Sequence, residues 1–355
     1  MNVLRFLGWM RQRGWDVLFY GEPETHMFRQ AEAFGVQAIP LCARLRSGDL
    51  RTSWRLSRRL REDGVRWLTL HQSADLLTGV AGRMMTGRAT RLIYHQHMHI
   101  GGDKKDFYHR WLYGQLDAFV TPVQWLADRV LEKTTIDPAR LHVIPRGIEI
   151  ARYTENLPDK AAARARFNLP QDALVIGVIG RLDPKKGQHV AVEALAKLHE
   201  AGHRVHLLLI GNPTRDEGNV YAVRVHQLVA DLHLADYVHF RPHEEQPQWA
   251  YAALDIFALT SKSECYGMVT VEALTSGLPV VATNDGGTVS LIEHEQNGLL
   301  VRPLDADDLA RAFTRLIEQP ELAARLGRTA HERALATFSH HDQCDAWEKL
   351  LRGLG

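Results

Sequence analysis

Long apolar runs, paired cysteines and a dominant charge are all missing from this sequence of 355 residues. No stretch comes near the roughly 18 apolar residues that cross a membrane, and the N-terminal residues lack the layout of a secretory signal peptide. The three cysteines, Cys42, Cys265 and Cys344, share no metal-ligand spacing and form no disulfide framework. These absences predict a protein of the reducing cytoplasm that neither spans a membrane nor is exported.

Charge of one sign is not in excess either, because the formal net charge is only +1. The balance conceals an asymmetry, since residues 1–150 carry +7 and the remaining residues carry −6. The sequence pI of about 7.9 and the absence of any recognised nucleic-acid motif argue against a nucleic-acid partner. The basic first half instead suggests an acidic or membrane-borne partner.

Helical and strand patterns alternate along the chain. A helical period over Asn2–Arg13 precedes a strand pattern over Asp16–Tyr20, and the alternation continues to Arg91–His95. In the second half, the continuous apolar run Ala173–Gly180 is typical of a buried strand. Length and alternation together predict an α/β protein of two doubly wound, Rossmann-like domains, each with a parallel sheet covered on both faces by helices.

The most informative stretch is Ser261–Pro279, which predicts a tight loop and then a helix. Glu264 lies before this helix and Glu272 lies within its first two turns. A carboxylate next to an anion site predicts a ligand with both hydroxyls and phosphate, such as a sugar nucleotide. The anion site would consist of the backbone N–H groups that have no carbonyl within the helix to bond, namely those of Gly267, Met268 and Val269.

Two motifs carry a family resemblance. The pattern Ser-x-x-Glu-x-x-Gly-x-x-x-x-Glu-Ala-x-x-x-Gly-x-Pro-Val-Val-Ala at residues 261–282 resembles the signature of the retaining family 4 glycosyltransferases with the GT-B fold. The turn Gly-Arg-Leu-x-x-x-Lys-Gly at residues 180–187 is similar to the first strand-to-helix turn of the donor domain in that family. The resemblance implies two Rossmann-like domains that face each other across a cleft.

The resemblance also implies roles for these residues. Glu264 would contact hydroxyls of the donor sugar, the amides of residues 267–269 would hold the distal phosphate, and Glu272 would bind the ribose. Arg181 and Lys186 would converge on the diphosphate and neutralise the charge that builds on the leaving nucleoside diphosphate. The alternatives are an ordinary crossover with glutamate caps and a solvated basic turn.

The same resemblance divides the chain into an acceptor-side domain over residues 1–150, a donor domain over residues 151–335, and a terminal helix over residues 336–355 that crosses back to the first domain. Three departures from the family pattern accompany it. The first strand and the glycine-rich loop that usually precede the first helix are absent from this sequence. Arg241 and Pro242 stand where a glycine is usual, and Ser290 stands where a glutamate is common. The identity of the donor base is therefore left open.

A predicted strand ends in three alternate histidines, His95, His97 and His99. Alternate strand positions span too far for easy ligation of one zinc ion, and no fourth ligand suggests itself. The resemblance points to His97, with His95 close behind, as the group that orients the acceptor hydroxyl or donates to a sugar hydroxyl. A structural role is the alternative for His95 and the preferred interpretation of His99.

Metal chemistry is not expected elsewhere either. The segment Asp305-Ala306-Asp307 precedes a helix predicted over Leu309–Glu318, so its carboxylates are interpreted as helix caps. The sequence thus predicts no metal and no cofactor, and the nucleotide sugar is a substrate.

The acceptor side offers weaker signals. Lys104 and Lys105 precede several aromatic residues, a mixture that suits a sugar or lipid-phosphate acceptor. A helix predicted over Leu50–Glu62 carries five arginines and Trp54. Such a helix either lies on anionic lipid or presents a solvated face, and the solvated face is the preferred reading.

Together with these observations, the resemblance implies a retaining hexosyltransferase in which His97, Arg181, Lys186 and Glu264 act at the reaction centre. The sugar would move from a nucleotide donor to a hydroxyl of a saccharide or lipid-linked acceptor, in cell-surface polysaccharide, lipopolysaccharide or glycolipid synthesis, with peripheral contact to the inner face of the anionic cytoplasmic membrane. Two alternatives remain: a nucleotide-sugar epimerase or phosphorylase of the same fold, and an inactive sugar-nucleotide-binding protein.

Overall fold

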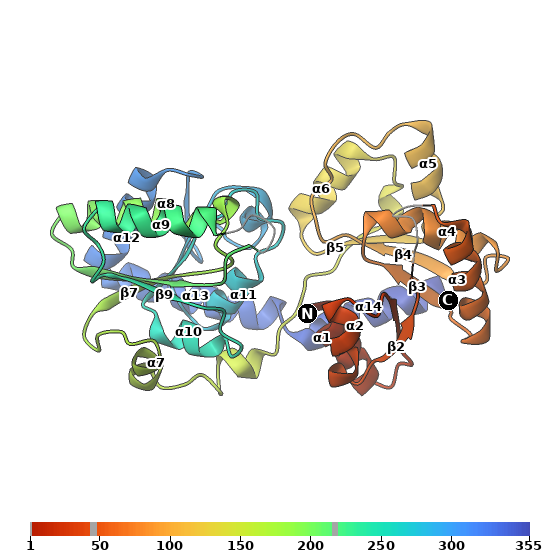
Figure 1. Cartoon of the computed structure of the whole chain (residues 1–355), viewed down its shortest axis with the longest axis horizontal. Helices are drawn as coiled ribbons and strands as arrows, with labels where there is room; N and C mark the ends of the chain where they lie inside the picture. The colour runs from red at the N-terminus through yellow and green to blue at the C-terminus, as the bar shows by residue number, and fades with distance from the viewer. Residues whose placement is uncertain (1, 43–47, 215–218) are drawn as a thin grey trace. The chain divides into compact units, whose positions relative to one another are not determined.

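The computed structural model describes residues 2–42, 48–214 and 219–355. They form two compact units: an N-terminal unit, Met1–Gly147 with His340–Gly355, and a C-terminal unit, Ile148–Ser339. In each unit helices cover a parallel sheet (Figure 1). The predicted α/β class with two Rossmann-like domains is confirmed.

The strands of the N-terminal unit all pair in parallel. Four of them form one sheet in the order β3-β4-β5-β6, and two form a separate pair, β1-β2. Their bounds are β1 Leu18–Gly21, β2 Gln37–Pro40, β3 Trp67–Leu70, β4 Arg91–His95, β5 Ala118–Thr121 and β6 Leu141–Val143.

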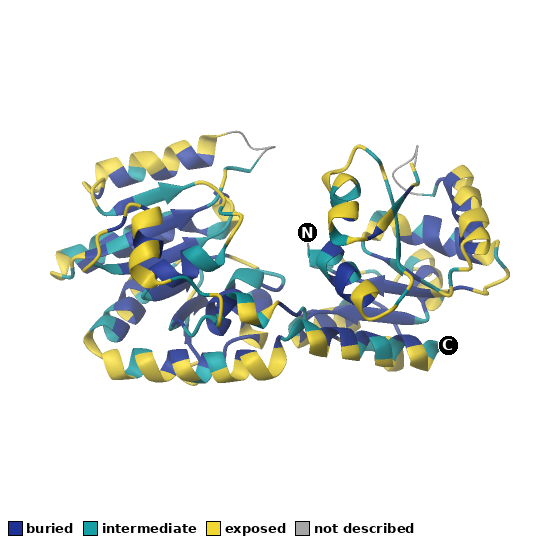
Figure 2. Cartoon of the chain, turned by 90° about the horizontal axis from the view of Figure 1, so that it is seen from below, coloured by how far each residue is buried: buried dark blue, intermediate teal, exposed yellow. Residues whose placement is uncertain are grey.

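Helices cover both faces of the four-stranded sheet. Successive strand residues point to opposite sides, so apolar side chains lie on each face and pack against helices. On β4, Leu92 packs in one apolar cluster with Leu56, whereas its neighbour Ile93 packs in another with Trp347. The sheet is accordingly buried between helices whose outer surfaces are exposed (Figure 2). The helices of this unit are α1 Asn2–Gln12, α2 His26–Gln30, α3 Leu50–Glu62, α4 Leu76–Met84, α5 Phe107–Gly114, α6 Gln124–Lys133 and α14 His340–Leu354.

The C-terminal unit contains a six-stranded parallel sheet in the order β12-β11-β10-β7-β8-β9. Its first strand, β7, lies inside the sheet, and the chain builds outward from it first on one side and then on the other. The order therefore reverses between β7 and β10, where doubly wound sheets bind their ligands. The strands are β7 Leu174–Ile179, β8 Val205–Ile210, β9 Val238–Arg241, β10 Ile256–Leu259, β11 Val280–Thr283 and β12 Leu299–Val301.

Apolar side chains of α8, α9 and α12 pack with one face of this sheet in a single buried cluster. On α12, the Asp305 side chain caps the helix by accepting from the N–H of Asp308 at 2.8 Å, which confirms the predicted cap. The helices of the unit are α7 Lys160–Arg166, α8 Gln188–Glu200, α9 Val220–Asp231, α10 Gln248–Ala253, α11 Met268–Thr275, α12 Ala306–Glu318 and α13 Pro320–Thr337.

Candidate functional site

The loops after β7 and β10 meet at the point where the strand order of the C-terminal unit reverses. Lys186 follows β7, Glu264 follows β10, and the Lys186 Nζ lies 2.5 Å from the Glu264 Oε2. The two side chains are 27% and 15% exposed, so the ion pair is partly shielded but still reaches solvent. Two of the residues predicted for the donor site are thus brought together from positions far apart in the sequence.

Close backbone packing fixes the Lys186 turn. Asp183 accepts from the N–H of Lys185 at 2.9 Å, and Gly187 then adopts a φ of +68°. A Cβ at Gly187 would overlap the carbonyl oxygen of Thr260, whose hydroxyl donates to the Lys186 carbonyl at 2.7 Å. Glycine is therefore required both for the left-handed conformation and for the approach of β10's loop.

Arg181 lies on the same turn but is exposed. Its backbone carbonyl accepts from the side chain of Gln188 at 2.8 Å. Among the described residues its guanidinium makes no ion pair. The structure therefore places Arg181 at the predicted end of the sheet without joining it to the Lys186–Glu264 pair.

The backbone of Glu264 is held by a glycine pair that follows β11. The N–H of Gly287 donates to the Glu264 carbonyl at 2.6 Å. Gly286 has a φ of +64°, and a Cβ there would overlap the same carbonyl. Next to Glu264, Ser263 has a φ of +56° and donates its N–H to Asp285 at 2.9 Å. The carboxylate thus projects from a loop fixed on both sides.

Helix α11 begins directly after Gly267, which has a φ of +83°. The amides of Gly267, Met268 and Val269 come before the first intrahelical hydrogen bonds, as predicted for an anion site. The hydroxyl of the fully buried Thr270 has no hydrogen-bond partner in the described part of the chain. Helix α11 therefore offers its N-terminus at the same sheet edge as Glu264.

Glu272 lies one turn into α11 and is buried. Its Oε2 accepts from the hydroxyl of Tyr251 at 2.7 Å, and the same hydroxyl lies 3.1 Å from the carbonyl of Val269. Burial, and then the Glu272 charge, raise the pKa of Tyr251 well above its usual value, so the phenol stays a donor. Tyr251 therefore orients Glu272, although no sequence motif marks it.

Three histidines gather at the carboxyl end of the sheet in the N-terminal unit. His71 follows β3, His95 ends β4 and His97 comes two residues later. His71 Nδ1 lies 2.8 Å from His97 Nε2, and Arg146, which follows β6, donates to His97 Nδ1. Both ring nitrogens of His97 are therefore engaged within the protein.

The histidine trio, His71, His95 and His97, is the set that could hold a metal ion, since one nitrogen of each lies within 4.8 Å of the others. The expectation that alternate histidines lie too far apart holds only for His99, whose ring instead meets Trp125 edge-on. The chain leaves the strand after His95, which brings the rings of His95 and His97 to 4.3 Å, and His71 comes from the neighbouring strand.

Burial lowers the pKa of all three rings. For His71 burial, and then the Arg146 charge, lower the pKa to about 4. His95 is buried, and neither of its ring nitrogens has a hydrogen-bond partner among the residues described. At neutral pH the trio is thus uncharged.

The predicted acceptor lysines lie outside this cluster. The backbone of Lys104 pairs with that of Lys133 near the end of α6, and Lys105 is exposed. In the ranges that the structure describes, neither lysine side chain forms a hydrogen bond or ion pair with the histidines.

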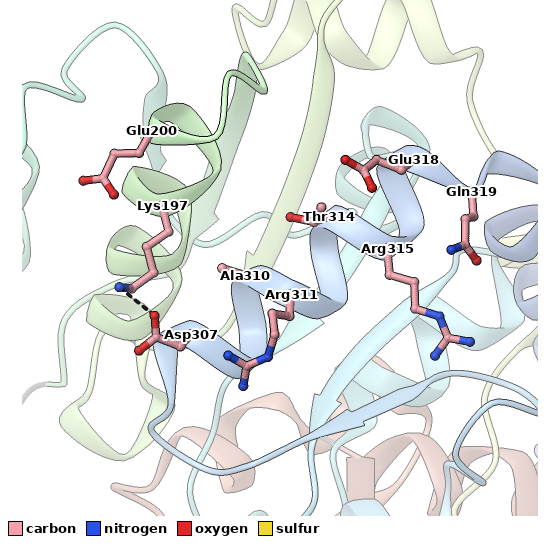
Figure 3. A pocket seen from close by; sticks show the side chains of 9 residues that line it. All are labelled: Lys197, Glu200, Asp307, Ala310, Arg311, Thr314, Arg315, Glu318 and Gln319. Atoms are coloured by element: carbon pink, nitrogen blue, oxygen red, sulfur yellow. Dashed lines mark ion pairs between the residues drawn. The ribbon is translucent and has the colours of Figure 1, made fainter.

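A groove between α8 and α12 contains none of the residues predicted for the donor or acceptor sites (Figure 3). Side chains of both charge signs line it, and Lys197 Nζ pairs with Asp307 Oδ1 at 2.7 Å. The groove lies on helices α8 and α12 and adds nothing to the site at the strand ends.

Sequence reasoning missed four participants: His71, Arg146, Tyr251 and Gly286. Two of them carried a signal, since His71 follows its strand as His97 follows the next one, and Arg146 follows β6. The same sheet edge collects residues from all three strand ends.

No helix in the described ranges is long and apolar enough to cross a membrane.

Family comparisons match both halves of the chain. Residues 159–333 match the family described as glycosyl transferases group 1, and residues 2–152 match Glycosyltransferase Family 4. The D-inositol 3-phosphate glycosyltransferase of Stackebrandtia nassauensis is 35% identical over 231 residues, which cover 63% of this chain and 52% of that protein. The enzyme of the same name from Streptomyces bingchenggensis is 30% identical over 243 residues, covering 66% and 51%. The chain spans about half the length of these relatives.

Solved structures agree in fold. A glycosyltransferase from Rickettsia africae matches with a TM-score of 0.90 at 17% identity, over 99% of this chain and 94% of that one. The Anabaena protein HepE in complex with UDP matches with a TM-score of 0.87 at 22% identity, over 99% and 95%. With both halves matched and the strand-end motifs in place, the chain belongs to the family 4 glycosyltransferases of the GT-B fold.

Proposed function

We propose that the chain is a retaining glycosyltransferase that moves a sugar from a nucleotide-sugar donor to the hydroxyl of a saccharide or lipid-linked acceptor. The observation that carries the proposal is the Lys186–Glu264 pair at the reversal of strand order, next to the N-terminus of α11. A cation, a carboxylate and free amides at one sheet edge match a ligand with a diphosphate and sugar hydroxyls. Glu272, held by Tyr251, is assigned to the ribose.

In this mechanism Lys186, Arg181 and the amides of α11 stabilise charge on the leaving diphosphate as the glycosidic bond breaks. Glu264 holds the sugar hydroxyls beside them. The acceptor oxygen bonds to the anomeric carbon on the face that the phosphate leaves, and the acceptor proton passes to a phosphate oxygen. No metal ion is assigned to the reaction. Trapping of a glycosyl-enzyme intermediate in rapid-quench mass spectrometry would contradict this front-face route.

A donor panel tests the proposal. Thermal shift with nucleotide sugars of different bases and sugars, UDP-sugars first, should identify a stabilising donor, and a product screen with candidate acceptors should then show transfer. Conversion of the donor without any acceptor would indicate an epimerase. Donor binding without transfer to any acceptor would indicate a binding protein.

The acceptor proposal has a second candidate. The relatives at 35% and 30% identity are named for D-inositol 3-phosphate, which makes a phosphorylated cyclitol the alternative to a lipid-linked saccharide. The +7 charge of residues 1–150 suits either anionic acceptor. Transfer to a neutral soluble acceptor with no dependence on salt would contradict an anionic acceptor.

Membrane contact belongs to the lipid-linked alternative. Helix α3 buries Leu56 and Leu60 while Leu50 and Trp54 are 70% and 53% exposed, and the helix also carries five arginines. Two of these arginines pair with Glu62, which is the arrangement of a solvated helix face. Flotation with anionic but not neutral vesicles, weakened by Trp54→Ala, is expected if α3 docks on lipid. Equal recovery with both vesicle types would remove this part of the proposal.

A further inference from the structure

The contacts of His97 determine where its proton lies. A guanidinium can only donate, so the bond from Arg146 requires an unprotonated, accepting Nδ1 on His97. A neutral imidazole then carries its proton on Nε2, which donates to His71 Nδ1 across 2.8 Å. His71 in turn carries its own proton on Nε2. One arginine therefore sets the tautomers of two histidines.

We propose that Arg146 is a positioning residue that holds His97 as the neutral tautomer protonated on Nε2 and, through it, orients His71. While this chain of bonds persists, His97 has no nitrogen left for a sugar or acceptor hydroxyl. An anionic acceptor group that draws Arg146 away frees His97 Nδ1 to accept a hydrogen bond. This last step rests on the proposed function, whereas the tautomer itself does not.

The surroundings of the trio favour the uncharged tautomers. His95, from β4, packs against both other rings, at 4.3 Å from His97 and 5.5 Å from His71. The ring of Trp347, on α14, also lies 5.2 Å from that of His95. Arg146 is the formal charge that acts on all three rings, and it opposes a second positive charge there.

The same bond argues against a resident metal ion in the trio. A histidine that ligates a metal through Nε2 donates its Nδ1–H to a carboxylate, carbonyl or water. Here the group on His97 Nδ1 is a cation with no acceptor atom. Metal binding would require the opposite tautomer of His97 and would place a cation near Arg146.

The test is nitrogen NMR on the full chain labelled with ¹⁵N-histidine. The chain has 19 histidines. The signals of His97 and His71 are assigned by their loss in His97→Gln and His71→Gln. We expect wild-type His97 to be protonated on Nε2 and unprotonated on Nδ1 at pH 7. A wild-type His97 protonated on Nδ1, or on both nitrogens, would overturn the proposal without any variant and independently of transferase activity.

Three substitutions then separate the role of Arg146 from simple packing. Arg146→Lys keeps a hydrogen-bond donor and should keep the tautomer of His97. Arg146→Met offers neither a donor nor an acceptor and should give a mixture of the two tautomers. Arg146→Glu supplies only acceptors and should move the proton of His97 to Nδ1. Arg110→Met, at an exposed position on α5, is the matched control and should leave the spectrum of His97 unchanged. Wild-type tautomers in both the Met and Glu variants would show that Arg146 does not set them.

Cobalt binding gives a second readout. Because Arg146→Glu frees His97 Nε2 and removes the positive charge, we expect it to bind Co²⁺ at least about tenfold more tightly than the wild type, a factor typical of such outer partners. The bound ion should perturb His71, His95 and His97 together. Binding to the wild-type trio as tight as to the Glu variant would overturn the proposal. Transfer assays that fail for every donor would refute the proposed function but leave these results intact.

Discussion

The two units build their strand ends from opposite chemistry. In the C-terminal unit the reversal point holds a charged pair, Lys186 and Glu264, that reaches solvent, whereas in the N-terminal unit the strand ends hold three neutral histidines and Arg146. In the proposed function, the charged pair exchanges its internal contact for a phosphate and a sugar. His71 and His97 are held by hydrogen bonds within the unit, and His95 is held by ring packing. The carboxyl ends of two parallel sheets in one chain thus carry charged side chains in one unit and uncharged rings in the other.

The substitution with the largest expected effect on the charged pair is Lys186→Ala. Removing a cation that stabilises the leaving group is expected to lower kcat by about 100-fold or more, measured as product formed per enzyme under saturating donor. Lys185→Ala is the matched control, because Lys185 is exposed on the same turn. Near-normal turnover in Lys186→Ala would refute its assigned role.

Low pH should destabilise the N-terminal unit through its buried histidines. The folded pKa of His71, about 4, lies below its ordinary 6.5, so the neutral ring's contribution to stability is complete above pH 6.5 and is lost as the pH falls towards 4. The loss is up to about 3 kcal/mol. The free energy of unfolding, measured with urea at pH 7, 5.5 and 4.5, should decline less for His71→Gln than for the wild type. His26→Gln, at an exposed position, is the control and should decline as the wild type does. Identical declines in all three proteins would contradict the assignment.

A glycine substitution next to Glu264 should have a smaller effect, on stability and on donor binding. Ala at Gly286 combines a φ of +64° with an overlap on the Glu264 carbonyl, whereas Ala at Gly202 has a φ of +91° in open space. The backbone conformation alone costs about 1–2 kcal/mol in either variant. We expect Gly286→Ala to lose more unfolding free energy than Gly202→Ala and to weaken donor binding, which Gly202→Ala should not. Equal losses and unchanged donor binding in the two variants would show that this contact does not position Glu264.

Sequence patterns predicted the charged side better than the histidine side. The helix predicted within Ser261–Pro279 is present and begins at Met268, and the loops with Lys186 and Glu264 meet because both follow parallel strands. His71, His97 and Arg146 meet only through the order of three strands, which local periodicity does not encode. Tyr251 escaped notice because its hydroxyl reaches Glu272 from 21 residues earlier in the chain, a contact that local periodicity does not encode either.

The central claim is that the reversal point of the C-terminal sheet binds the donor. A crystal structure of the chain soaked with the nucleoside diphosphate or nucleotide sugar that stabilises it most would test this directly. The account predicts the diphosphate on Lys186 and the amides of residues 267–269, with Glu264 released from Lys186 and turned to the sugar. A ligand bound elsewhere while the Lys186–Glu264 pair stays closed would contradict it.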